Sequence, residues 1–139
     1  MKVLTGPCKG VKIKIDIRKG GSYFYGNYDK WIFKRINLNR FLEPGMVAWY
    51  CGAFYGYYGA VFRKLVGENG RVEIFEASQE NYQIVSTLPY LNKWDNGFVH
   101  KLAVGPDHSK IAFKTNLGRE SGPLDILKTG VLVGSDIEV

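Results

Sequence analysis

The sequence predicts an α/β fold built on a small parallel sheet, and three observations lead to that prediction. Two short runs rich in apolar and aromatic residues, 46–51 and 71–75, are separated by an amphipathic stretch that ends at Val66. A glycine turn at Gly52 follows the first run, and a carboxylate, Glu76, follows the second. Strands that alternate with helices in this order form parallel sheets.

Residues 11–18 alternate apolar and charged side chains, which predicts a strand with one buried face. From Asp29 the apolar positions take a helical period, so we expect a helix that Asp29 or Asn27 can cap and that ends before Pro44-Gly45. These two elements would form an N-terminal extension of the core.

The remaining elements follow the same alternation. We expect a helix from about Gly56 to Val66, and a third helix over 79–88 with Ser78 as its cap and Pro89 as its end. A third core strand is predicted over 99–104. Residues 110–115 follow a turn and are expected to pair back as a hairpin. We therefore expect one domain, with an extension at 1–43 and a core at 44–139.

The spacing of the glycine turn and the acid favours a nucleoside ligand. Glycines at Gly52 and Gly56 let the backbone turn sharply and approach a ligand, and the amides of the next helix then face the crevice. Glu76 lies 24 residues after Gly52, near the roughly 20-residue offset at which an acid reaches a ribose. Phe54 would crowd a diphosphate, so a nucleoside without phosphates fits better.

Several segments stand in a characteristic order along the chain: 43–58, 65–77, Asn81, Leu91-Asn92 and 100–105. In this order they resemble the successive motifs of FkbM-type methyltransferases, a class I family that depends on S-adenosylmethionine. The resemblance runs from about residue 25 to the C-terminus.

The resemblance implies a Rossmann-like class I methyltransferase half-fold of about three parallel strands, with S-adenosylmethionine as cofactor. It implies O-methylation of a small molecule or sugar, so that a small-molecule methyl acceptor would be the partner. It names no catalytic residue. It also implies the residues that bind the cofactor. Gly52, Ala53 and Gly56 would approach the methionine part, and Glu76 would hold the ribose. Ala103 and Val104 would lie near the adenine.

Three departures from the family pattern weaken the prediction of activity. The family usually has an aspartate where this chain has Tyr50, and a small polar residue, commonly asparagine, where it has Phe54. The family's next strand should follow Val139, where the chain ends. A non-catalytic, truncated S-adenosylmethionine-binding remnant is therefore the first alternative.

Composition predicts a single domain in a reducing compartment. With 139 residues and 45% hydrophobic content the chain can bury one core. Cys8 and Cys51 fit no metal or redox spacing, and Cys51 is expected to be a small buried strand residue. No cleavable leader follows Met1, so a cytoplasmic location is expected.

The net charge of +6 is concentrated near the N-terminus. Residues 1–40 hold ten Lys and Arg against two acids. A basic surface of this kind could bind RNA, so an RNA methyltransferase is the second alternative. A strand face exposed to solvent is the simpler interpretation, and we do not expect nucleic acid as a partner.

A membrane span over 44–62 is not expected, because its tyrosines are spread throughout the segment instead of gathered at its ends. No pair of histidines and cysteines has metal spacing, so no metal is expected. The edge of the strand at 46–51 would lack a neighbour in a half-fold. We therefore expect a homo-oligomer, or a completing partner, at that exposed sheet edge.

Overall fold

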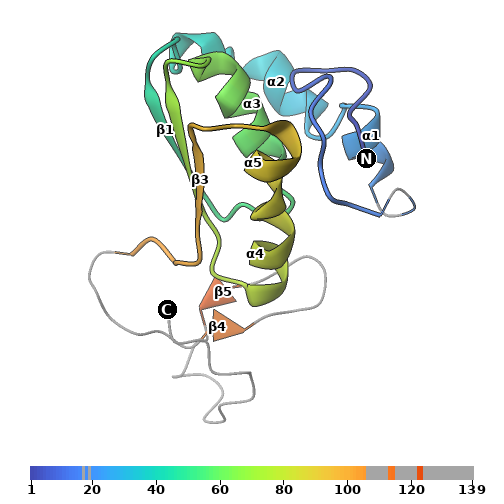
Figure 1. The fold of residues 1–139 in the computed structure, drawn as a ribbon. Coiled ribbons are helices and arrows are strands. Elements are labelled where there is room, and N and C mark those ends of the chain that lie inside the picture. The colour runs from blue at the N-terminus through green and yellow to red at the C-terminus, as the bar shows by residue number, and fades with distance from the viewer. Residues whose placement is uncertain (17, 19, 106–112, 115–121, 124–139) are drawn as a thin grey trace.

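Three parallel strands form the centre of the protein in a computed structural model that describes residues 1–16, 18, 20–105, 113–114 and 122–123. They are β1 (Val47–Cys51), β2 (Arg71–Phe75) and β3 (Gly97–His100). They hydrogen-bond in the order β1-β2-β3, and all pairs are parallel (Figure 1). The predicted α/β class is therefore confirmed.

Three helices cover one face of this sheet. They are α3 (Tyr57–Val66), α4 (Gln79–Val85) and α5 (Thr87–Asn92). Helix α3 begins and ends as the sequence predicts. The predicted helix over 79–88 is interrupted at Ser86, and α5 then continues through Pro89. A proline within the first turn of a helix is tolerated because its missing N–H would have no partner there.

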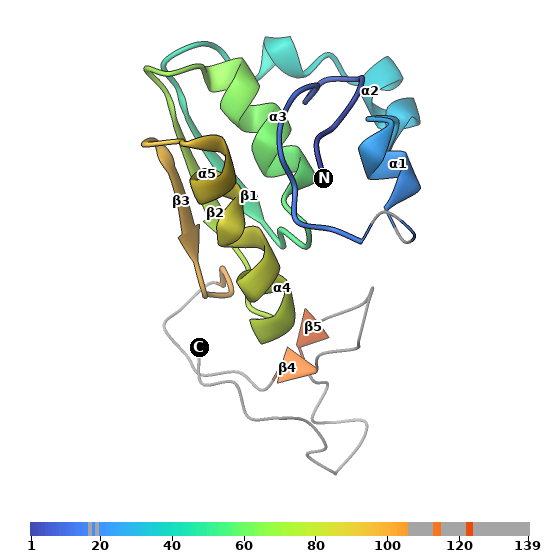
Figure 2. The ribbon, with the colours of Figure 1, turned by 45° about the vertical axis from the view of Figure 1, so that its right-hand side comes forward.

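The N-terminal part packs on the same side of the sheet as these helices, beside α3 (Figure 2). It contains α1 (Gly21–Phe24), α2 (Lys30–Arg35) and the 3₁₀ turn η1 (Leu38–Arg40). The predicted helix from Asp29 is thus present but short. Asp29 precedes α2 with a φ of 50° and makes no capping hydrogen bond, because its carboxylate accepts one from the Tyr58 hydroxyl (3.0 Å) instead.

The strand predicted over 11–18 was wrong. Among the described residues this segment makes one isolated antiparallel bridge, between Lys2 and Lys12. The alternation itself is real, since Val11 and Ile13 are buried while Lys12 and Lys14 are exposed. On the side that faces away from Lys2, the backbone of Lys12 pairs with a side chain in place of a strand. Asn92 accepts from its N–H (2.7 Å) and donates to its C=O (2.8 Å).

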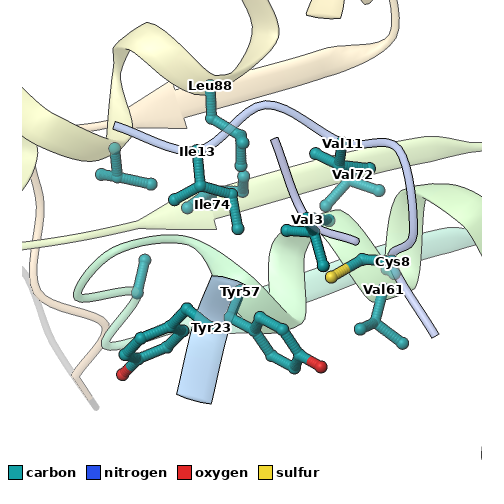
Figure 3. Close-up of a cluster of buried hydrophobic side chains, with 14 of the residues drawn as sticks. Val3, Cys8, Val11, Ile13, Tyr23, Tyr57, Val61, Val72, Ile74 and Leu88 are labelled. Atoms are coloured by element: carbon teal, nitrogen blue, oxygen red, sulfur yellow. The ribbon is translucent and has the colours of Figure 1, made fainter. Parts of the chain in front are cut away.

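The main core lies between the sheet and the N-terminal segment (Figure 3). Val3, Cys8 and Ile13 of that segment are almost fully buried. They join side chains from α3, the sheet and α5, namely Tyr57, Val61, Val72, Ile74 and Leu88. The Tyr57 hydroxyl donates to the carbonyl of Gly26 (3.1 Å), which fastens the N-terminal part to α3.

A short hairpin is described after the third strand. It pairs β4 (Phe113–Lys114) with β5 (Gly122–Pro123) in antiparallel fashion. The sequence predicted that 110–115 pairs back across the turn at 106–109, which lies outside the described residues, whereas the observed partner of Phe113–Lys114 is the later segment Gly122–Pro123. The predicted third strand began too late, since β3 starts at Gly97 and ends at His100.

The other face of the sheet is not covered by any described helix. The β1 side chains that point there are exposed, with 59% for Val47 and 62% for Trp49. Cys51 lies on the same face and is exposed as well, which corrects the prediction that it is buried. Parallel sheets normally bury both faces, so this face is unusual in its exposure.

Gly56 is required by packing, which generates a stability prediction. It has a φ of 82°, and a β-carbon there would lie 2.8 Å from Leu88 Cδ2 and 2.9 Å from Val85 Cγ2. Gly52 has a φ of 77° and open space around it. Both alanine variants should lose about 1–2 kcal/mol of unfolding free energy, because alanine is strained in a left-handed backbone conformation. Gly56→Ala should lose about 1–3 kcal/mol more of unfolding free energy, because its methyl group would crowd Leu88 and Val85. Denaturant unfolding measures the difference, and equal losses would contradict the packing role.

Asn92 generates a second stability prediction. Its amide nitrogen donates to the carbonyls of Lys12 and Leu88 (2.8 Å each). Asn92→Asp keeps an acceptor for the Lys12 N–H but loses both donated bonds, so unfolding free energy should fall by about 1–2 kcal/mol. Asn69→Asp, at an exposed position, is the control and should change stability little. If both variants unfold alike, Asn92 does not fasten the N-terminal segment.

Candidate functional site

The glycine turn at the carboxyl end of β1 leaves open space beside the backbone. Gly52 is exposed, and a β-carbon there would meet nothing within 4 Å. Its N–H donates to the carbonyl of Phe75 at the end of β2 (2.9 Å). The turn is therefore held against the neighbouring strand while its outer side stays accessible. Ala53, the next residue, is 1% exposed and belongs to the core.

Glu76 is the charged residue that connects the loops after β1 and β2. It follows β2 directly and is 5% exposed. One carboxylate oxygen, Oε2, accepts from the Phe54 N–H (2.8 Å), and the other, Oε1, accepts from the Ser78 N–H (2.9 Å). Glu76 thus ties the loop after β1 to the loop after β2. Its own N–H donates to the carbonyl of His100 (3.0 Å), which adds the end of β3.

A carboxylate held in this way can still accept further hydrogen bonds. An ionised carboxylate has about four lone-pair sites, and the two backbone amides use two of them. The remaining two suit the adjacent hydroxyls of a ribose. Glu76 is thus a buried carboxylate held in a fixed orientation, and its role in binding a ribose stays a prediction.

Phe54 holds a backbone conformation that few bulky residues adopt. Its φ is 50°, in the left-handed region. Its ring centroid lies 3.9 Å from that of Tyr55. Asparagine, which the resemblance leads one to expect here, is tolerated far better at such a φ. The loop therefore keeps the shape that asparagine suits while presenting an aromatic ring.

Tyr50 stands where the resemblance leads one to expect an aspartate. Its ring packs on Tyr58 and Phe62 of α3, with centroids 5.9 and 5.7 Å away. Burial raises the pKa of the Tyr50 phenol, so it stays neutral at physiological pH. This position supplies a neutral, packed side chain in place of a negative charge.

The other residues predicted for the site lie at its margins. Gly56 faces Val85 and Leu88, so the structure gives it a packing role, and its approach to a cofactor stays a prediction. Ala103 is half-buried and Val104 is 51% exposed. Both follow the end of β3, at the same edge of the sheet as Gly52 and Glu76, because all three strands are parallel.

A second polar cluster, which the sequence analysis did not identify, lies on the uncovered face of the sheet. Glu73 is bonded to His100 Nε2 (2.6 Å) and to the Arg71 guanidinium. Burial of Glu73 would by itself raise the pKa of its carboxyl, but the bonds from His100 and Arg71 outweigh it, so this pKa is lowered. His100 also stacks on Phe75 (4.9 Å). Such diagonal pairs across parallel strands cannot be read from one strand's sequence.

In the part of the chain that the structure describes, no three metal-ligating side chains come together. His108 lies outside that part. None of the helices described above is both long and apolar enough to span a membrane.

Comparisons with known proteins give a partial likeness in fold. No protein-family model matches the chain, and no curated protein matches it. A candidate rRNA methylase from Clostridium thermocellum has a TM-score of 0.45 and 22% identity, over 48% of this chain and 38% of that one. A protein-L-isoaspartate O-methyltransferase has a TM-score of 0.42 and 22% identity, over 55% of this chain and 23% of that one. A SAM-dependent methyltransferase from Aquifex aeolicus has a TM-score of 0.43 and 23% identity, over 55% of this chain and 40% of that one.

The matched part spans less than half the length of each of these three proteins. Likeness at this level assigns no function to the chain. The function is therefore argued from the residues at the carboxyl ends of β1 and β2.

The lowered pKa of Glu73 generates a prediction for acid stability. Glu73 stabilises the folded protein above the unfolded pKa of about 4.3, and this contribution is lost as the pH falls through the lower folded pKa. Glu73→Gln should therefore flatten the fall in unfolding free energy between about pH 6 and pH 3. Denaturant titrations across this range measure it. Glu68→Gln is the exposed control, and a Glu73→Gln curve parallel to wild type would refute the effect.

Proposed function

We propose that the chain binds S-adenosylmethionine at the carboxyl ends of β1 and β2 and serves an FkbM-type O-methyltransferase whose acceptor is a small molecule or sugar. The observation that carries this proposal is Glu76. It is a buried carboxylate at the end of β2, held by the Phe54 and Ser78 amides and beside the open turn at Gly52. The order of family-like motifs supports it.

In this proposal each element has a separate task. Glu76 accepts the ribose hydroxyls with its two remaining lone pairs. Gly52 gives the methionine part access to the backbone, and Ala103 and Val104 flank the adenine. S-adenosylmethionine, when bound, supplies an activated methyl group, so the protein mainly has to position donor and acceptor.

A non-catalytic binder is the second candidate, and Tyr50 is the observation that favours it. A neutral phenol packed against α3 cannot replace a carboxylate that the family pattern places toward the cofactor. Phe54 removes a second polar group from the same turn. In this alternative the nucleoside still binds at Glu76, but no methyl group is transferred.

Calorimetry with S-adenosylmethionine and S-adenosylhomocysteine tests the proposal. Glu76→Gln should weaken binding by about 1–3 kcal/mol, because an amide accepts weaker hydrogen bonds than a carboxylate. Glu68→Gln is the matched control, since it removes the same charge from an exposed position outside the site. Equal affinity of Glu76→Gln and wild type, or no heat with either ligand, would contradict the proposed site.

The double change Tyr50→Asp and Phe54→Asn extends this test. It restores the two polar groups that the family pattern contains, so affinity should rise. Transfer of a labelled methyl group by the restored protein but not by wild type would select the non-catalytic alternative. Transfer by wild type itself would select the enzyme.

A further inference from the structure

The open edge of β1 is the surface that the proposed function leaves unexplained. Among the described residues β1 pairs with β2 alone. The carbonyl of Met46 accepts from Arg71, and the N–H of Gly52 donates to Phe75, so the even-numbered residues face β2. Because backbone groups alternate along a strand, those of Val47, Trp49 and Cys51 point away from β2.

This edge carries none of the features that protect edge strands in monomers. Between Val47 and Cys51 there is no charge and no proline. Monomeric proteins usually place lysine, proline or a bulge at such an edge. Edge β3, by contrast, is shorter, begins at Gly97 and is followed by Lys101. The β1 edge is therefore the better template for pairing.

Exposed apolar side chains lie along this edge and just before it. Met46 is 41% exposed, Val47 59% and Trp49 62%. Since a fully buried aromatic side chain covers about 150–250 Å², these three residues offer on the order of 300 Å². A standard interface takes about 800 Å² from each partner. The surface therefore suits a dimer that forms and dissociates with concentration.

We propose that two copies of the chain associate through antiparallel pairing of their β1 strands. A two-fold axis at Trp49 sets Trp49 opposite its own copy and Val47 opposite Cys51 of the second copy. The side chains on one face of this pair are Val47, Trp49 and Cys51, which are apolar or uncharged, so identical chains do not repel each other there. The pairing joins two three-stranded sheets into one of six strands and covers Trp49.

Sedimentation of the full chain tests the association. Wild type should shift from monomer to dimer as its concentration rises. Trp49→Lys should remain monomeric with an unchanged circular dichroism spectrum, because a lysine at this exposed position blocks edge pairing without entering the core. A wild-type chain that stays monomeric at every concentration would overturn the proposal, as would a dimer that survives Trp49→Lys.

A disulfide tests the register without relying on that variant. Directly opposed residues of a hydrogen-bonded antiparallel pair have α-carbons about 5.5 Å apart, within the range that a disulfide spans. Under mild oxidation Val47→Cys should therefore link to native Cys51 of the second copy and give a covalent dimer. The double variant Val47→Cys/Cys51→Ser should not form that bond.

Tyr90→Cys is the matched control for random collisions. Tyr90 is 85% exposed, more than Val47, and lies on α5 away from β1. If Tyr90→Cys cross-links to Cys51 as readily as Val47→Cys does, the register is wrong. Higher-order chains in place of a dimer would show open-ended pairing that also uses β3, and would likewise overturn the two-fold arrangement.

Discussion

The carboxylate of Glu76 is the contact on which the arrangement at the carboxyl end of the sheet depends. It binds the amides of Phe54 and Ser78 at once, so the loop after β1 and the loop before α4 are fixed to each other. Its burial at 5% exposure makes these bonds costly to leave unmade. The left-handed backbone of Phe54 is held by the same bond, which explains why a phenylalanine remains in that conformation.

The sequence predicted the parallel core well because each element has a local signal. The apolar run to Cys51, the amphipathic stretch to Val66 and the acid after Phe75 fixed the first two strands and α3 with correct order. The N-terminal strand failed for a reason that no local pattern reveals. Its alternation only reports that one face is buried, while its backbone bonds residues 1–3 on one side and the Asn92 side chain, 80 residues away, on the other.

The site was predictable in part. The spacing from Gly52 to Glu76 correctly placed a carboxylate beside the glycine turn, since parallel strands bring their carboxyl ends together. Spacing could not show that Gly56 packs on α5 or that Cys51 is exposed, because both depend on which face a later element covers. The Arg71, Glu73 and His100 cluster depends on strand register in the same way.

Nuclear magnetic resonance of the backbone amides during an adenosine titration tests the central claim most directly. If Glu76 anchors a nucleoside site, shifts should concentrate at the amides of Phe54 and Ser78, which share its carboxylate, and at Gly52 and Ala103 along the same edge. Shifts confined to the N-terminal segment or to the uncovered sheet face would contradict the account. So would a spectrum that adenosine leaves unchanged.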